Sequence, residues 1–341
     1  MKNCPNCKFE VSDTAKFCRN CGFNIKKYEE ENQGGTMFCD ECGAKIPFGS
    51  AFCEECGFKL DTDNASSSVG FDFGAINNIS TFATEQLYEQ NGLKVENGVL
   101  VEYIGKKRNV IIPGTIEEIF NKAFENNEFV TSVKIEEGVQ VIGASAFYGC
   151  TNLTSIEIPN SVTLIDNSAF RGCVKLTSVK IPNGVTTIGY SAFYGCTSLT
   201  SIEIPKGVTS IGEDAFKYCS SLTSIEIPNG VTTIGNSAFQ DCTNLTSIEI
   251  PNGVTTIGNC MFYTCTNLTS IEIPSSVTTI CRYAFGICEK LTSIEIPSSV
   301  TTVGEGAFYA CKNLKSIRLS RNCKCGYDWN LFCPAKVEYI D

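Results

Sequence analysis

The chain has 341 residues, among them 21 cysteines, 29 glycines and no histidine, and its formal net charge is −10. The missing histidine excludes Ser-His-Asp and Cys-His nucleophile pairs, the His-containing zinc sites of hydrolytic enzymes and any imidazole general base. Because nucleic acids are bound through clustered Lys and Arg, the net negative charge argues against a nucleic-acid-binding surface that spans the chain.

The distribution of apolar residues predicts no membrane insertion, because no segment approaches the roughly 18 uncharged apolar residues of a membrane span. The first residues, Met1 to Pro5, lack the basic and then apolar run of a secretory signal. We therefore expect a cytoplasmic protein whose thiols are kept reduced. Since 21 is odd, disulfides cannot pair every cysteine, and a metal or packing role is considered for each.

Eight N-terminal cysteines form two modules of identical spacing. In each module, two Cys-x2-Cys pairs are separated by ten residues, and four thiolates can close a tetrahedron around Zn²⁺. Modules of about 20 residues bury too little apolar surface to fold alone, so the metal supplies most of their stability. We expect two structural zinc ions, with iron in the same thiolate cage as the rival. The ligand sets are Cys4, Cys7, Cys18 and Cys21, and Cys39, Cys42, Cys53 and Cys56.

Both modules resemble the short zinc ribbons found singly or doubled at bacterial protein N-termini. They keep an aromatic residue before the second cysteine pair and a glycine after it, namely Phe17 and Gly22, and Phe52 and Gly57. Lys8 stands where such ribbons usually have glycine, and this change leaves the ligands undisturbed. The resemblance implies zinc ribbons at residues 1–26 and 37–60.

Two linkers are expected. Residues 27–36 contain three consecutive glutamates and a Gly-Gly pair, which favour solvated chain, and residues 61–90 begin with a Ser- and Gly-containing stretch that reads as flexible. Within the second linker, the segment from Ile79 is a candidate for a short helix.

From residue 91 onward the sequence repeats with a period of 23 residues, which is the signature of stacked coils. Cysteine, phenylalanine and, with one exception, proline recur in this register. The cysteines are Cys150, Cys173, Cys196, Cys219, Cys242, Cys265, Cys288 and Cys311. The phenylalanines run in the same way from Phe124 to Phe308.

One repeat unit predicts two short strands. Ile225 and Ile227 point to one face and Ser224 and Glu226 to the other, as the period of two in a strand requires. A Pro-Asn-Gly turn follows, and then a second short apolar strand that ends at Ile234. The apolar burial within a single coil does not offset the conformational entropy lost on ordering it. Only stacking through hydrogen bonds between coils therefore makes the unit stable.

The fold class predicted is therefore mainly β: a parallel-sheet solenoid occupying residues 91–341. Ten in-register strand positions end at Ile112 and at every equivalent residue to Leu319, so we expect about ten coils. The ends of a solenoid need caps, and residues 93–104 and 323–340 are assigned to them.

The repeat form C-x-x-L-x-S-I-x-I-P-x-x-V-x-x-I-G-x-x-A-F resembles the BspA-type leucine-rich repeats over roughly residues 95 to 320. The resemblance implies a curved parallel-sheet solenoid used for protein recognition. The family is known for surface adhesins and host-binding proteins, so an adhesin exported without a recognisable signal is an alternative function.

The repeated cysteines are predicted to be buried free thiols that pack as small apolar groups. Equivalent atoms of stacked strands lie about 4.8 Å apart, whereas a disulfide needs Cβ atoms nearer 3.8 Å. Cys323, Cys325 and Cys333 lie outside the repeat, and we weigh a third metal site there against packing in the cap, which we favour.

The outward positions of the first strand carry a column of acidic residues. Lys134, Lys180 and Arg318 interrupt or flank the column. A solvated face kept by repeat duplication and recognition of a Lys/Arg-rich protein are the two interpretations, and Ca²⁺ has too few oxygen ligands here. The candidate partner-binding residues are Glu203, Glu226, Glu249, Glu272 and Glu295.

These observations favour a non-enzymatic protein-protein interaction scaffold with two zinc ribbons. No acid, base and nucleophile come together outside the repeat, so an enzyme is not expected. The rival is a nucleic-acid-associated regulator acting through the ribbons. Residues 1–60 hold 8 Lys+Arg and 9 Asp+Glu and so present no basic face, which makes a nucleic-acid partner unlikely.

Overall fold

The structure, a computed structural model, describes residues 2–3, 10–11, 36–38, 45–47 and 88–340. The chain divides into two compact units. One comprises Met1–Gln90 with Lys107–Asn109, and the other comprises Asn91–Lys106 with Val110–Asp341.

The described part of the first unit contains two pairs of short antiparallel strands. β1 (Lys2–Asn3) pairs with β2 (Glu10–Val11), and β3 (Thr36–Phe38) pairs with β4 (Lys45–Pro47). In both modules, the two strands flank the first Cys-x2-Cys pair in the sequence, so the modules share one local pattern. The eight cysteines, the linker 61–87 and the start of its candidate helix lie outside the described residues; residues 88–90 are helical.

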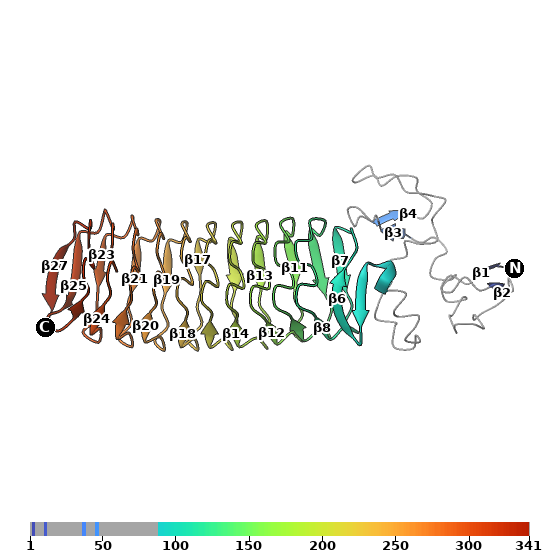
Figure 1. The fold of residues 1–341 in the computed structure, drawn as a ribbon, viewed down its shortest axis with the longest axis horizontal. Helices are drawn as coiled ribbons and strands as arrows, with labels where there is room; N and C mark the ends of the chain where they lie inside the picture. The colour runs from blue at the N-terminus through green and yellow to red at the C-terminus, as the bar shows by residue number, and fades with distance from the viewer. Residues whose placement is uncertain (1, 4–9, 12–35, 39–44, 48–87, 341) are drawn as a thin grey trace. The chain divides into compact units, whose positions relative to one another are not determined.

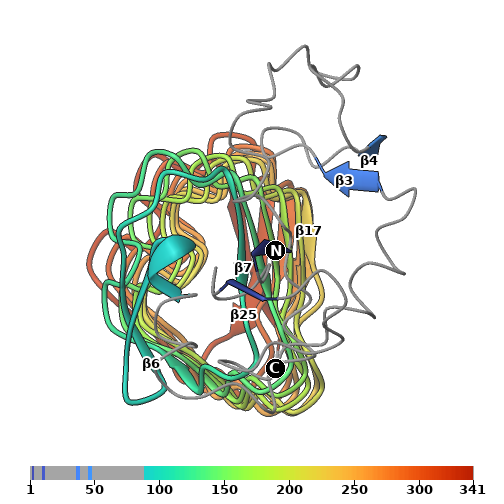
Figure 2. The same cartoon turned by 90° about the vertical axis from the view of Figure 1, so that its right-hand side faces the viewer.

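The second unit is a stack of coils with two rows of strands (Figures 1 and 2). The first row, in which β11, β15, β19, β21 and β23 carry the sequence S-I-E, consists of β7 (Asn109–Ile112), β9 (Ser132–Ile135), β11 (Ser155–Glu157), β13 (Ser178–Lys180), β15 (Ser201–Glu203), β17 (Ser224–Ile225), β19 (Ser247–Glu249), β21 (Ser270–Glu272), β23 (Ser293–Glu295), β25 (Ser316–Ser320) and β27 (Lys336–Ile340). The second row consists of β6 (Val99–Tyr103), β8 (Glu118–Ile119), β10 (Val141–Ile142), β12 (Leu164–Ile165), β14 (Thr187–Ile188), β16 (Ser210–Ile211), β18 (Thr233–Ile234), β20 (Thr256–Ile257), β22 (Thr279–Ile280), β24 (Thr302–Val303) and β26 (Lys324–Cys325).

Within each row the strands that pair do so in parallel, in groups of two or more, and residues lie beside their equivalents in the next coil. Ser247 faces Ser270 and Glu249 faces Glu272 in the first row, and Thr256 faces Thr279 in the second. The 23-residue period of the sequence is thus the register of the sheet, which confirms the predicted parallel solenoid. Viewed along its axis in Figure 2, successive coils follow one another closely.

An antiparallel hairpin begins the solenoid. β5 (Leu93–Glu96) pairs with β6, and β6 pairs in parallel with β8, so the hairpin joins the second row as its first member. Leu93 and Leu100 are fully buried. The hairpin expected at residues 93–104 is therefore present.

The C-terminal end differs from the expectation of ten strands followed by a cap. Residues 323–340 form an eleventh coil, because β26 pairs with β24 and β27 with β25, both in parallel. Ser316 lies opposite Lys336, a spacing of 20 residues rather than 23. Parallel pairing uses backbone groups, so it continues after the side-chain pattern and the period have lapsed.

Phenylalanine rings form a continuous column through the core. The rings from Phe124 to Phe308 stack with centroids 4.7 to 5.8 Å apart, and each is at most 1% exposed. Tyr103 stacks on the first ring at 4.8 Å, and Trp329 lies edge-on against the last at 6.0 Å. The column therefore begins and ends with aromatic residues that also carry a polar group.

A second column consists of the eight repeat cysteines, which are fully buried free thiols, as predicted. Each Sγ donates a hydrogen bond of 3.0 to 3.2 Å to the carbonyl oxygen of the phenylalanine 26 residues earlier. The thiols are therefore more than apolar filling: each one joins two coils. Burial raises the pKa of Cys196 and Cys311 to about 12, so these groups stay protonated.

Candidate interaction surface

The first row of strands presents alternate residues to solvent. In β15, β19 and β23 the serine and the glutamate are exposed, and the isoleucine between them is buried against the core. This alternation places one glutamate of each of these coils on the outer face of the row. The outward column expected from the sequence is thus formed from residues 92 positions apart, between Glu203 and Glu295.

Both ends of the glutamate column are paired with cations. Lys180 Nζ lies 3.5 Å from Glu203 Oε2, and Arg318 Nη1 lies 2.7 Å from Glu295 Oε2. In each case the two residues face each other across neighbouring strands. The side chains of these pairs are 48 to 75% exposed, so the pairs contribute little to stability.

The three middle glutamates lack such partners. Glu226, Glu249 and Glu272 are exposed, and within residues 88–340 none of them forms an ion pair or hydrogen bond. Glu249 and Glu272 lie directly opposite each other in the parallel register, and Glu226 follows β17 one coil earlier. Like charges about 4.8 Å apart repel by roughly 1 kcal/mol in water. We call Glu226, Glu249 and Glu272 the unpaired glutamate row.

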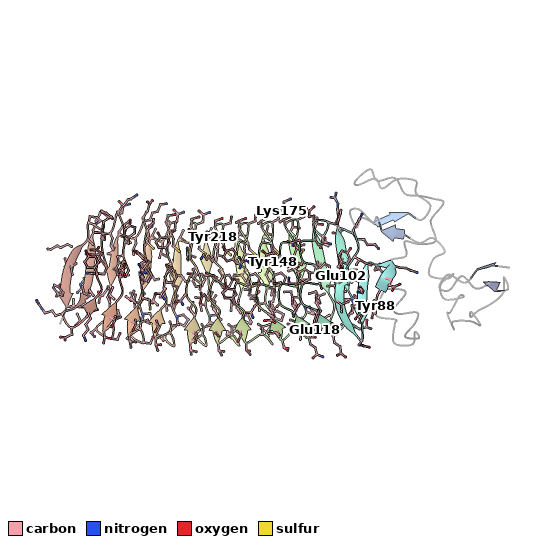
Figure 3. All side chains as sticks on the ribbon, in the orientation of Figure 1. Tyr88, Glu102, Glu118, Tyr148, Lys175 and Tyr218 are labelled. Atoms are coloured by element: carbon pink, nitrogen blue, oxygen red, sulfur yellow. The ribbon has the colours of Figure 1, made fainter. Side chains whose placement is uncertain are left out.

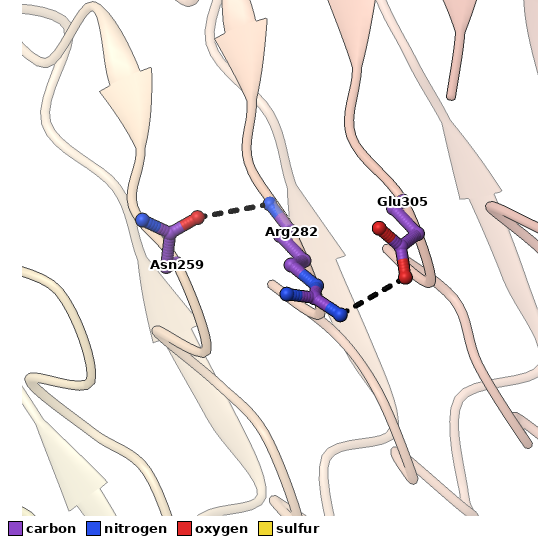
Figure 4. Close-up of polar contacts among 3 residues, drawn as sticks. All are labelled: Asn259, Arg282 and Glu305. Atoms are coloured by element: carbon purple, nitrogen blue, oxygen red, sulfur yellow. Dashed lines mark hydrogen bonds and ion pairs between the residues drawn. The ribbon is translucent and has the colours of Figure 1, made fainter. Parts of the chain in front are cut away.

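Two carboxylates elsewhere on the solenoid, Glu289 and Glu305, are matched by cations of a neighbouring coil. Arg282 donates from Nη2 to Glu305 Oε1 at 3.0 Å while its backbone N–H donates to Asn259 Oδ1 at 3.2 Å, so three coils are bridged (Figure 4). Lys312 Nζ lies 3.1 Å from Glu289 Oε1 in the same way. Compared with these contacts, the unpaired glutamate row is a local excess of negative charge.

A shallow groove of about 1150 Å³ borders this row, at the ends of β13, β15 and β17. Its lining contains the apolar steps Ile204-Pro205 and Ile227-Pro228 together with charged groups. The charged lining residues are Lys180, Glu203, Lys206, Glu226 and Glu249. The groove therefore extends from the ion pair between Lys180 and Glu203 to the unpaired Glu226 and Glu249.

An aromatic series on another side of the coils was missed by the sequence analysis (Figure 3 labels Tyr148 and Tyr218). The Arg171 guanidinium lies 4.1 Å from the Tyr194 ring and 6.0 Å from the Tyr148 ring, and Tyr194 meets Tyr218 edge-on at 5.3 Å. Tyr148 and Tyr194 directly follow a core phenylalanine in the sequence, and Tyr218 is the second residue after one. A consensus of the repeat hides such variation.

The three C-terminal cysteines, for which a third metal site was weighed against packing, lie in the eleventh coil. Cys323 and Cys333 are half-buried and Cys325 is exposed. Within the described residues, no group of three or more Cys, Asp or Glu side chains is placed to hold a metal ion. The thiol of Cys325 is partly desolvated although the residue as a whole is exposed, and this raises its pKa to about 11, with the neighbouring Cys323 as the second cause.

Two family models match the chain. A model of the BspA-type leucine-rich repeat region, built of six copies, matches residues 102–223 and 209–332. This chain belongs to the BspA-type leucine-rich repeat family. A double zinc ribbon model matches residues 4–57, the segment that holds both cysteine modules. The family of the repeats and that of the N-terminal modules are those that the sequence motifs indicated.

Solved BspA-type and related leucine-rich repeat proteins resemble the chain. A leucine-rich cell surface protein of Faecalibacterium prausnitzii A2-165 is 27% identical over 71% of this chain and 90% of its own, with a TM-score of 0.42. The T. pallidum leucine-rich repeat protein is 31% identical over 57% of this chain and 82% of its own, with a TM-score of 0.42. No curated protein matches the sequence. Among the described residues, no helix is both long and apolar enough to span a bilayer.

Proposed function

We propose that this BspA-type repeat protein is a non-enzymatic protein-interaction scaffold that binds a Lys/Arg-rich partner on the outer face of its first strand row. The unpaired glutamate row supports the proposal, because its three exposed carboxylates have no ion-pair partner within residues 88–340, whereas the carboxylates at both ends of the column do. Cations of a partner would remove the repulsion along this row, and such charge complementarity gives specificity and fast association.

The test is titration calorimetry of the full chain with a synthetic peptide of alternating lysine and serine, at low and at physiological salt. We expect binding that weakens as salt rises, and a loss of roughly tenfold or more in affinity when Glu226, Glu249 and Glu272 are all changed to Gln. A matched control changes Glu117, Glu128 and Glu213 to Gln, which removes the same charge away from the row. If the two triple variants bound the peptide with equal affinity, the unpaired glutamate row would not be the binding site.

We further propose that residues 1–60 hold two structural zinc ions, one in each cysteine module. The support is the repeated ligand spacing and the shared strand pair beside the first cysteine pair of each module. Metal analysis of the purified chain should give two equivalents of zinc, and Cys7→Ser should give one. Iron in place of zinc, or no change in Cys7→Ser, would contradict this assignment.

The cellular location proposed is the cytoplasm, where the eight buried thiols and the cysteines of the modules stay reduced. The rival is the cell surface, as the name of the F. prausnitzii relative states for that protein. Cell fractionation separates the two.

The nucleic-acid alternative is addressed by a gel shift with the full chain at physiological salt, and we expect no shift because residues 1–60 carry 8 Lys+Arg against 9 Asp+Glu.

A further inference from the structure

The groove beside the glutamate column carries opposite charges at its two ends. Lys180 and Lys206 lie toward its N-terminal side, and Glu226 and Glu249 lie one and two coils further along the solenoid. Lys206 departs from the repeat, because the same turn position holds Asn183 in the coil before it and an asparagine in the coil after it. Lys206 therefore adds a cation to the groove that the neighbouring repeats lack at this position.

Three of these charged groups are free to meet a partner. Lys180 already lies 3.5 Å from Glu203. Lys206, Glu226 and Glu249 are exposed, and within residues 88–340 none has an ion-pair partner. The groove therefore offers one uncompensated cation followed by two uncompensated carboxylates. A uniformly basic segment would set a cation against Lys206, with a cost similar to the gain at one glutamate.

The length of the groove indicates the size of its occupant. The lining comes from four successive coils, from the one that contains Ser178 to the one that contains Glu249. At about 4.8 Å per coil the groove spans roughly 14 Å, which an extended chain covers in four to five residues at about 3.3 Å each. The floor includes Ile204, Pro205 and Ile227, all buried, so small apolar side chains suit the middle of such a segment.

We propose that this groove binds an extended protein segment of mixed charge, about five residues long, with an acidic residue beside Lys206 and Lys or Arg beside Glu226 and Glu249. The inference rests on the proposed function, because both use the outer face of the first strand row. It adds that the partner's sequence must change sign within one short segment.

The test uses fluorescein-labelled peptides of the order Asp-Ala-Val-Lys-Arg and the reverse order Arg-Lys-Val-Ala-Asp. Both orders are used because the groove does not fix the direction in which the bound chain runs. Each is compared with the same peptide carrying Ser in place of Asp, by fluorescence anisotropy with the full chain at low salt. We expect one of the two orders to bind roughly two- to fivefold more tightly than its Ser counterpart. Lys206→Asn should abolish that difference.

The control variant combines Lys206→Asn with Ser298→Lys. It restores the net charge and places a lysine at the same turn position four coils away. Because Asn and Ser are the residues that other coils carry at this position, these variants should fold like the parent, which circular dichroism checks. The control variant should bind the Asp and Ser peptides equally.

The outcomes separate the two proposals. Suppose that Glu226→Gln weakens the binding of both the Asp and the Ser peptide. If the parent then shows no preference for the Asp peptide, or if Lys206→Asn leaves that preference unchanged, the basic partner stands and the mixed-charge segment is overturned. If neither Glu226→Gln nor Glu249→Gln changes any affinity, the proposed function itself fails. A preference that the Ser298→Lys control retains would also overturn the assignment to Lys206.

Discussion

The Sγ of Cys219 donates a hydrogen bond of 3.2 Å to the carbonyl oxygen of Phe193, and the backbone N–H of Cys196 donates to that same oxygen at 3.2 Å. Two neighbouring coils thus share one acceptor, and its bonding capacity is filled. The arrangement recurs at all eight repeat cysteines. It explains why a cysteine, rather than an alanine or a valine, occupies this position in eight successive coils.

The thiol of Cys219 is therefore expected to stabilise the solenoid. Changing Cys219 to Ala leaves a small cavity and removes one donor, so we expect a loss of roughly 1 to 2 kcal/mol in the free energy of unfolding. Urea unfolding followed by circular dichroism measures the loss. The matched control is Cys260→Ala, because Cys260 is only half-buried and donates no such bond, and its effect should stay within about 0.5 kcal/mol.

Raman spectroscopy gives an independent check on the same bond. The S–H stretching band of the native protein should lie below the frequency of a free thiol, and unfolding should move it upward. Equal losses in Cys219→Ala and Cys260→Ala, together with an unshifted band, would show that the column thiols act as apolar filling alone.

The buried thiols also predict a loss of stability in alkaline solution. Burial raises the pKa of Cys150, Cys196 and Cys311 to about 12, whereas an unfolded thiol titrates near 8.5. A raised folded-state pKa means that the stabilisation is complete below the unfolded pKa and is lost as the pH rises toward 12. Each such thiol lowers the free energy of unfolding by about 1.4 kcal/mol per pH unit within this window.

Urea unfolding from about pH 8 to about pH 10.5 measures this slope. Tyrosine and lysine titrate in the same range, so the informative quantity is the difference between the parent and Cys196→Ala. The variant should show a slope smaller by the contribution of one thiol. Identical slopes would mean that Cys196 is accessible to hydroxide in the folded chain.

Trp329 offers a probe of the C-terminal end, because it is the only tryptophan in the chain. Its ring covers the end of the phenylalanine column at Phe308, yet no residue from 321 to 340 is buried. Terminal coils contact one neighbour only, so they unfold before the middle of the stack. We expect the tryptophan fluorescence midpoint in urea to lie below the circular dichroism midpoint, and coincident transitions would show that the eleventh coil unfolds with the rest.

Much of the fold followed from periodicity. A spacing of 23 residues identifies the register without further information, since Ser247 must lie beside Ser270 once the coils stack. The eleventh coil could not be predicted in this way, because Lys336 follows Ser316 after 20 residues and no residue of the consensus marks it. Backbone pairing continues where the side-chain pattern has ended, and a pattern search cannot detect that.

The candidate surface was predicted in part. The column from Glu203 to Glu295 follows from strand alternation, but its division into paired ends and an unpaired middle depends on how far the Lys180 and Arg318 side chains reach. The hydrogen bond of each thiol and the contact between Arg171 and Tyr194 likewise depend on rotamers. Such contacts join coils at fixed distances that the sequence spacing does not specify.

The unpaired glutamate row predicts that one charge-removing substitution stabilises the protein. Glu249 has a like-charged neighbour on each side, so Glu249→Gln should raise the free energy of unfolding by roughly 0.5 to 1 kcal/mol at low salt. Glu203→Gln removes the partner of Lys180 and should lower or leave unchanged the same quantity, by at most about 1 kcal/mol. Both effects should shrink as salt screens the charges.

Urea unfolding of the two variants at low and at high salt decides the matter, because the signs differ while the chemical change is the same. Opposite signs that converge at high salt would mean that the free face is held under electrostatic repulsion, which a cationic partner relieves on binding. If Glu249→Gln changes the free energy of unfolding as Glu203→Gln does, the carboxylates of the row are too far apart for appreciable repulsion. The row would then give a partner no such gain in free energy.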